Sequence, residues 1–280
     1  MSATHPLVGF TYRTELHDEI MANRSHFEIL EVVADQLMDA SPVVAGPILA
    51  DLAQFPVVMH SLNLSLGSAH PCRTQYLEGL ATLAAKLRPL WCSDHLCFTQ
   101  SRELELGQLT PLPFTEEACD AVCANLRRVR AYLPQYQFLV ENITNYIHYP
   151  DNDYSEAGFI NQVLARSGAG LLLDINNVFV NSVNYRFDPY RFVDSIIPGA
   201  VQQVHIAGHQ HTELGELDSH DTRVSDEVWE LLEYALERLP IKAVTLEWDC
   251  DFPSTSVLID ELSIARQLCH GARTGAAQCR

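Results

Sequence analysis

Six apolar runs in this sequence each end on a residue that can bind a metal ion. Three of the runs end on histidine and three on aspartate or glutamate. Repeated runs of this kind are typical of a closed barrel of parallel strands, whose carboxyl ends share one rim and carry the polar chemistry. Imidazoles and carboxylates without thiolates suit iron, manganese or zinc. The six residues are His60 in PVVMH, His95 in LWCSDH, Glu141 in QFLVE, Asp174 in GLLLD, His205 in VQQVH and Glu247 in AVTLE.

The repetition of the pattern is what favours metal binding by these residues. A single histidine at a strand end is more often a hydrogen-bonded rim residue. Six buried polar groups at one barrel mouth would be costly, and a metal ion satisfies several of them together. Six ligands also exceed one tetrahedral shell. The sequence therefore predicts at least two ions with a carboxylate bridge, and Glu141, midway along the series, is the natural bridge.

A second group of polar residues follows two of these runs. Asn177 lies at the start of the loop that we expect after Asp174, where its amide oxygen can reach the same mouth. Asp218 and His220 are two residues apart, so in an extended loop their side chains point the same way. These residues could complete a further metal site.

Three residues have open roles at this stage. Glu31 ends the second apolar run and either orients a ligand or binds a metal itself. His209 and His211 lie in HIAGHQH, after the seventh run, and are either solvated loop histidines or part of the metal chemistry.

The rest of the chain alternates strand-like and helix-like runs. Continuous apolar strands separated by amphipathic helices indicate parallel strands covered by helices, and eight of them favour a (β/α)8 TIM-type barrel, an α/β fold. Three apolar stripes predict helices that begin near Tyr76, Cys119 and Val228, the last with Ser225 as N-cap. We expect the eight strands at 7–12, 27–33, up to 60, up to 95, up to 141, 171–175, 201–207 and 243–248.

Length and composition are consistent with one barrel. The chain has 280 residues, of which 47% are hydrophobic, enough for a sizeable core. We see no linker, and predict a single domain over residues 1–270 with a flexible tail at 271–280.

Charge and cysteine usage exclude several classes of partner. The net charge of −18 disfavours a DNA or RNA substrate, because an acidic surface repels phosphate. No signal peptide or membrane-spanning run is visible, so no membrane partner is expected and the predicted location is the cytoplasm. The eight cysteines form no CxxC pair, which argues against a thiolate zinc site.

Seven segments carry a resemblance to a known family. In order they are MHSLNLSLGS, SDHLCFT, LVENITNY, LLLDINNVFVNSVN, QVHIAGH, DSHD and LEWDCDFP. Together they resemble the multinuclear non-heme iron-dependent oxidative enzymes, over about residues 8–262. That family includes the methanobactin-pathway oxidase, the thiaglutamate-pathway enzyme and the enzymes that modify bufferin peptides. LLLDINNVFVN and LEWD are more similar to the thiaglutamate and bufferin branches, and the thiaglutamate-pathway enzyme is the nearest match that we expect.

The resemblance implies a barrel fold and a site of two or three irons in mixed Fe(II)/Fe(III) states. His60, His95 and Glu141 would hold one iron. Glu141 would bridge to a second, held also by Asp174, His205 and Glu247. Asn177, Asp218 and His220 would hold a third, labile iron. At position 209 some relatives have a residue other than histidine.

The resemblance also implies the reaction. The substrate would be a cysteine of a ribosomally synthesised precursor peptide, with O2 as co-substrate. A hydrogen would leave the cysteine β-carbon, followed by loss of that carbon or a related rearrangement, in natural-product biosynthesis. Glu141 and Asp174 would be the catalytic residues. A recruiting protein would bring the peptide and form a heterodimer with the enzyme.

Two other functions remain open from the residues alone. Sugar isomerases and metal-dependent endonucleases of the hydrolase class also place histidine and acidic ligands at a barrel mouth. The acidic charge argues against an endonuclease, and the only two lysines, Lys86 and Lys242, are expected away from the mouth, which argues against an isomerase. The other possibility is a metal-binding protein without catalysis.

Overall fold

The computed structural model describes residues 5–101 and 104–278 of the chain. The hydrogen-bonded strand order is β1-β12-β9-β8-β7-β4-β3-β2, a closed parallel barrel, so the predicted (β/α)8 fold is confirmed. The chain divides into two compact units, Val32–Leu172 and the pair of segments Met1–Glu31 and Leu173–Arg280. Strands β2 (Ile29–Val33) and β8 (Gly170–Asp174) contain the two boundaries.

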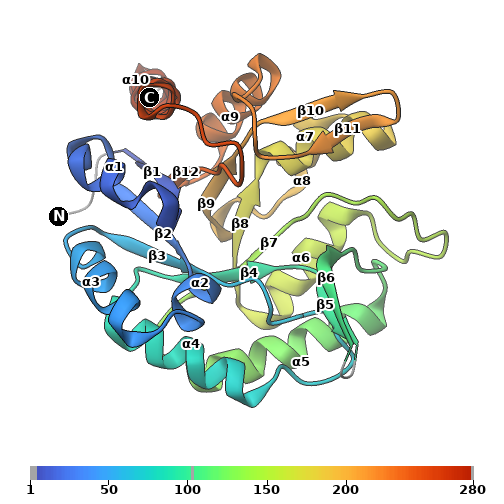
Figure 1. Cartoon of the computed structure of the whole chain (residues 1–280). Coiled ribbons are helices and arrows are strands. Elements are labelled where there is room, and N and C mark those ends of the chain that lie inside the picture. Colours follow the sequence, from blue (N-terminus) through green and yellow to red (C-terminus); the bar gives the residue numbers. More distant parts are fainter. Residues whose placement is uncertain (1–4, 102–103, 279–280) are drawn as a thin grey trace. The chain divides into compact units, whose positions relative to one another are not determined.

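The unit formed by Val32–Leu172 contains three further barrel strands, each fully or almost fully buried. His95 of β4 pairs with Glu141 of β7, and His60 of β3 pairs with Ser93 of β4. This register carries three polar strand ends to neighbouring positions. The strands are β3 (Val57–His60), β4 (Cys92–His95) and β7 (Phe138–Glu141), and the helices are α2 (Ala34–Met38), α3 (Pro42–Leu52), α4 (Thr74–Leu87), α5 (Glu116–Tyr132) and α6 (Glu156–Ser167) (Figure 1).

A two-stranded hairpin follows His95 in the same unit. Its strands are β5 (Phe98–Ser101) and β6 (Leu104–Thr110), paired antiparallel. Ser65 ties the preceding loop to this hairpin, because its Oγ accepts from the Thr99 N–H at 3.0 Å. Our sequence analysis missed the hairpin, since most of β6 is exposed and lacks the apolar run on which the barrel strands were recognised.

The other unit holds three neighbouring barrel strands. Gly9 of β1 pairs with Thr245 of β12, and Thr245 pairs with His205 of β9. Strands and helices alternate here as predicted. The strands are β1 (Leu7–Tyr12), β9 (Val201–Ile206) and β12 (Ala243–Leu246), and the helices are α1 (His17–Ala22), α7 (Ile175–Tyr185), α8 (Pro189–Ser195), α9 (Asp226–Arg238) and α10 (Thr255–Gln278), with 3-10 turns η1 (Thr14–Leu16), η2 (Arg24–His26) and η3 (Pro198–Ala200).

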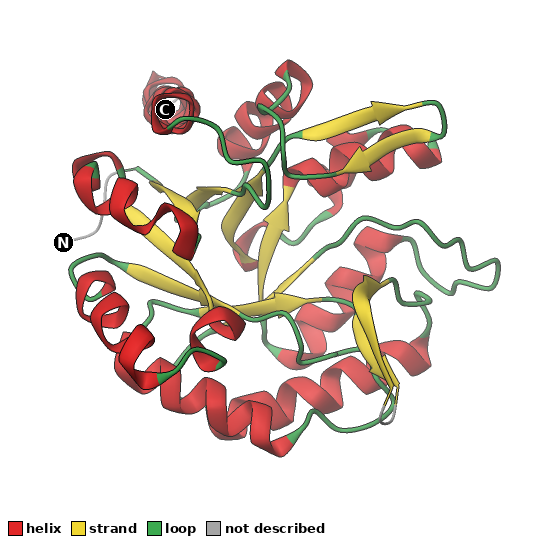
Figure 2. Ribbon diagram, in the orientation of Figure 1, coloured by secondary structure: helices red, strands yellow, loops and turns green. Residues whose placement is uncertain are grey.

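A second hairpin in this unit, β10 (His209–Thr212) and β11 (Gly215–Asp218), packs against α7 (Figure 2). Asn184 of α7 makes the connection, since its side chain both donates to the Glu216 carbonyl and accepts from the Glu216 N–H, each at 2.9 Å. His209 and His211 therefore lie on a strand and not in an irregular loop.

The predicted helices at three positions are confirmed as α4, α5 and α9, and Ser225 caps α9 by accepting from the Val228 N–H. Some strand limits were wrong by one or two residues. The sixth strand ends at Asp174, because that side chain caps α7 and Ile175 already belongs to the helix.

The last helix of the described residues is α10, which extends to Gln278, and residues 279–280 of the predicted tail lie outside the described residues. The tail at 271–280 and the single domain over 1–270 stay predictions. Among the helices of the described residues, none has the length and apolar character needed to cross a membrane.

Replacing Gly9 of β1 tests how closely this strand approaches Ile29 of β2. A Cβ on Gly9 would lie 1.8 Å from the backbone oxygen of Ile29, so Gly9→Ala must displace backbone, and we expect a loss of about 1–3 kcal/mol in the free energy of unfolding. Gly271→Ala is the control, because that position is helical with open space around it and should gain about 0.5–1 kcal/mol. Thermal unfolding of the two variants measures both changes, and an unchanged Gly9→Ala midpoint would contradict the close approach.

Candidate metal centre

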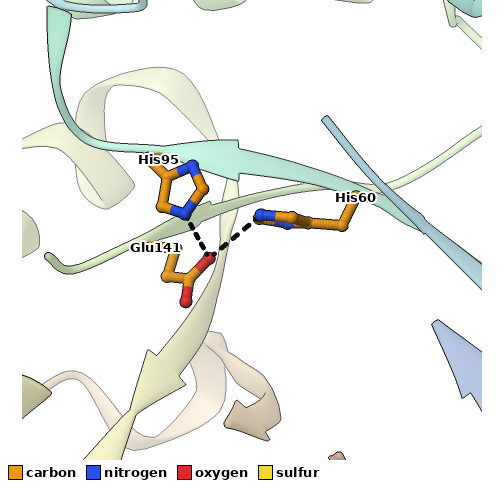
Figure 3. Close-up of side chains that lie close together, drawn as sticks. All are labelled: His60, His95 and Glu141. Carbon is orange, nitrogen blue, oxygen red and sulfur yellow. Dashed lines mark ion pairs between the residues drawn. The ribbon is translucent and has the colours of Figure 1, made fainter. Parts of the chain in front are cut away.

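Three buried side chains converge at the ends of β3, β4 and β7. The Nε2 atoms of His60 and His95 each lie 3.5 Å from the same oxygen, Oε2 of Glu141. Figure 3 shows the two imidazole rings directed at the Glu141 carboxylate. The two imidazole rings meet edge to face, with centroids 4.6 Å apart. His60 and Glu141 are each 1% exposed and His95 is 8% exposed. The structure brings these three predicted ligands together, and their role in binding a metal ion stays a prediction.

The spacing of these atoms fits a metal ion better than direct hydrogen bonds. Two ligand atoms about 2.1 Å from one ion at a tetrahedral angle lie about 3.4 Å apart, whereas an N–H···O bond is about 2.9 Å. The observed 3.5 Å agrees with the metal-bound spacing. A ligand atom of each residue lies within 4.8 Å of the others, so one ion could contact all three.

Residues beside the histidines hold the first cluster in place. Ser93 Oγ lies 2.8 Å from His60 Nδ1, on the far side of the ring from Glu141. Asp94 accepts from the His95 N–H at 2.7 Å and from Ser61 Oγ at 2.7 Å. Burial raises the pKa of Asp94 to about 7. The sequence analysis quoted both residues in SDHLCFT but gave them no role.

The second cluster lies at the ends of β8, β9 and β12. His205 Nδ1 is 3.3 Å from Glu247 Oε2 and 4.0 Å from Asp174 Oδ2. Asp174 also caps α7, accepting from the Asn177 N–H at 2.6 Å, so one of its oxygens is fixed by the helix. Thr245 pairs with His205, and Glu247 lies two residues further on the same side of the chain. These three predicted ligands are brought together.

Arg13 supplies the fixed positive charge of this cluster. Its guanidinium lies 3.2 Å from Glu247 Oε1, pairs with Asp249, and donates through Nε to the Trp248 carbonyl. Burial alone would raise the pKa of Glu247, but His220, His205 and Arg13 hold that pKa well below its usual range. Arg13 had no predicted role, because its link to Glu247 spans more than 230 residues and has no local signal in the sequence.

The side chains of Asp218 and His220 also lie together, but they do not do so through the extended loop that was predicted. Asp218 Oδ1 lies 2.6 Å from His220 Nε2. His220 has φ of 50°, in the left-handed region, so the backbone at this residue is not extended as the prediction supposed. Burial would lower the pKa of His220, yet Asp218 and Glu247 raise it well above its usual value. Asp249 Oδ2 lies 3.2 Å from His220 Nδ1, on the other edge of the ring.

Asn177 lies in the first turn of α7, not in a loop, and is 4% exposed. The helix begins there because Asp174 caps it. Its role as a third-site ligand stays a prediction. The neighbouring Asn176, which had no predicted role, donates to Asp218 Oδ1 and lies 2.8 Å from His209 Nδ1.

The two hairpin histidines differ from each other. Burial lowers the pKa of His209, which Asn176 orients. The side chain of His211 is 83% exposed and lies 2.8 Å from Glu216 Oε1. His211 therefore matches the solvated alternative, whereas His209 is held within the structure.

The fold and site define a (β/α)8 barrel that carries clusters of potential metal ligands. The family profile described as "RiPP precursor modification enzyme MbnB/TglH/ChrH" matches residues 7–270. The chain belongs to this family, whose members act on ribosomally synthesised and post-translationally modified peptide precursors.

Curated relatives agree with this assignment. A UPF0276 protein of Caulobacter vibrioides is 35% identical over 265 residues, covering 95% of this chain and 93% of the relative. A UPF0276 protein of Rhizorhabdus wittichii is 39% identical over 222 residues, 79% of each chain.

Solved structures show the same fold at low sequence identity. The 3-keto-D-glucoside 4-epimerase YcjR from E. coli has a TM-score of 0.61 at 12% identity, covering 94% of this chain and 99% of its own. Endonuclease IV from Thermus thermophilus has a TM-score of 0.57 at 16% identity, covering 96% and 100%. At these identities the likeness concerns the barrel alone.

Metal content tests the first cluster. Glu141→Gln replaces a charged carboxylate with a neutral amide and His60→Ala removes an imidazole, so we expect purified variants to hold at least one ion fewer per chain. His70→Ala is the matched control, since His70 is exposed and outside the cluster. Elemental analysis of anaerobically purified protein gives the count. Full metal content in Glu141→Gln would contradict its assignment as a ligand.

Proposed function

We propose that this protein is a multinuclear non-heme iron enzyme that uses O2 to modify a cysteine of a ribosomally synthesised peptide. Family membership supports the peptide substrate class. The observation that carries the metal chemistry is the pair of buried His/carboxylate clusters at the strand ends. Imidazole and carboxylate ligands suit iron, manganese or zinc, and the resemblance to the iron-dependent oxidative enzymes selects iron.

Each predicted ligand set has a defined task in this proposal. His60, His95 and Glu141 hold one iron, and Asp174, His205 and Glu247 hold a second. The family resemblance implies that Glu141 would also hold the second ion. Asn177, Asp218 and His220 hold a third, labile iron.

The protein's own residues prepare the site for chemistry. When bound, iron would supply a Lewis acid for the cysteine thiolate and electrons for O2. Buried carboxylates such as Asp174, which is 0% exposed, lie in a region from which the packed strands exclude water. Arg13 and the cap of α7 fix Glu247 and Asp174, so neither carboxylate needs to reorganise as the reaction proceeds.

The product and the partner follow from the family branch. The resemblance to the thiaglutamate branch favours excision of the cysteine β-carbon or a related rearrangement, in natural-product biosynthesis. A recruiting protein would form a heterodimer with this chain and present the peptide. Cytoplasmic synthesis of the precursor peptide agrees with the location predicted from the sequence.

The alternative classes have less support. A sugar epimerase and an endonuclease share the fold, but identities of 12% and 16% carry no argument about substrate. The net charge of −18 also disfavours a nucleic-acid substrate. A metal-binding protein without catalysis is the remaining alternative, and oxygen consumption separates it from the oxidase.

Oxygen uptake tests the reaction. We expect iron-loaded protein, given a cysteine-ended or cysteine-rich peptide, to consume O2 after an oxygen pulse, and the same peptide with serine in place of cysteine to give none. Asp174→Asn should reduce the rate at least tenfold, because a ligand charge is lost. Asp194→Asn, on an exposed helix face, is the matched control.

Comparing peptide turnover with and without oxygen distinguishes an oxidase from a protein that only binds metal. Peptide turnover that is equal with and without oxygen would rule out the oxidase, and metal binding without peptide-dependent oxygen uptake would favour a protein that only binds metal.

A further inference from the structure

Glu31 lies behind His205, and both side chains are 0% exposed. Each carboxylate oxygen of Glu31 lies 2.9 Å from His205 Nε2. On the opposite edge of the ring, His205 Nδ1 faces Glu247 at 3.3 Å and Asp174 at 4.0 Å. The imidazole therefore stands between Glu31 on one side and the candidate metal ligands on the other.

The carboxylate of Glu31 is itself held by neighbours on two strands. Thr11 Oγ1 donates to its Oε1 at 3.1 Å, and the Gln203 amide donates to its Oε2. The Gln203 amide also donates to Thr245 Oγ1 at 2.9 Å, which fixes the donor. With both oxygens engaged, Glu31 has little freedom to turn toward the ligand side of the ring.

The chemistry of this pair decides which ring nitrogen can bind a metal ion. Both oxygens of Glu31 accept hydrogen bonds from Thr11 and Gln203, so the ring nitrogen that faces them is the donor, Nε2–H of His205. The neutral ring then has its lone pair on Nδ1, which is directed at Glu247 and Asp174. A metal-bound histidine commonly donates its other N–H to a carboxylate in this way.

We propose that Glu31 is a positioning residue that makes His205 bind its metal ion through Nδ1. This inference rests on the metal-binding part of the proposed function and assigns Glu31 no contact with the ion. It resolves the choice left open by the sequence, between orienting a ligand and binding directly, in favour of orientation. The negative charge of Glu31 also strengthens Nδ1 as a ligand, because it stabilises the positive charge that the ring gains on metal binding.

Anaerobic titration with Co(II) tests the inference, with affinity and the visible absorption of bound cobalt as readouts. We expect Glu31→Ala to weaken one class of Co(II) site by about 10–100-fold. Glu31→Gln should lose less, because the amide oxygen can still accept from Nε2–H and keep the ring in place. Thermal unfolding of the metal-free variants shows whether they are folded, and Glu31→Gln keeps the test open if Glu31→Ala is not.

Two comparisons separate positioning from a general loss of stability. Glu261→Gln changes another buried carboxylate, 2% exposed and paired with Arg223 and the Val224 N–H, and should lower the unfolding temperature without changing Co(II) affinity. In a His205→Ala background, Glu31→Ala should have no further effect on affinity, since the ring on which it acts is gone.

The outcomes distinguish this inference from the function on which it rests. Wild-type protein that binds no Co(II) would overturn both. Wild-type binding with unchanged affinity in Glu31→Ala, or an effect that persists in full without His205, would overturn only the role of Glu31. Metal binding that depends on Glu31 but brings no peptide-dependent oxygen uptake would keep this inference and refute the oxidase.

Discussion

Burial of carboxylates at the ends of the strands is the constraint on which the site depends. An ionised carboxylate removed from water loses several kcal/mol of solvation unless positive charge replaces it. In the unit that contains His205, the described carboxylates of the cluster outnumber its one arginine, Arg13. Cations at these positions would satisfy the surplus charge, and the carboxylates concerned are Glu31, Asp174, Asp218, Glu247 and Asp249.

The register between neighbouring strands brings these polar strand-end residues together into clusters. His95 pairs directly with Glu141, so two residues separated by a long helix and a hairpin become neighbours. His205 pairs with Thr245, and the next residue on the same side of that chain is Glu247. Because parallel strands all present their carboxyl ends to one rim, a single ligand per strand is enough to assemble each set.

The sequence was sufficient for the barrel strands and for the polar residues that the structure brings together at their ends, because each of these residues ends an apolar run that the fold buries. It was insufficient where the signal was not periodic. The exposed strand β6 has no apolar run, and Asn177 was placed in a loop because the capping role of Asp174 was not recognised. Arg13 and Ser93 act on residues that are distant in sequence or on another strand, so nothing local marks them.

The partners behind the imidazoles explain why the rings can be in place before any ion arrives. His60 has a hydroxyl behind it, from Ser93, whereas His205 has the carboxylate of Glu31. Both partners lie on the barrel strands themselves, so the packing that closes the fold also fixes the two rings. The entropy lost in ordering each ring is then part of folding, and metal binding does not bear it again. Ligands held in this way would bind metal ions through their fixed positions as well as their charges. A buried residue such as Glu31, which does not contact the ion, can therefore still control the affinity for metal.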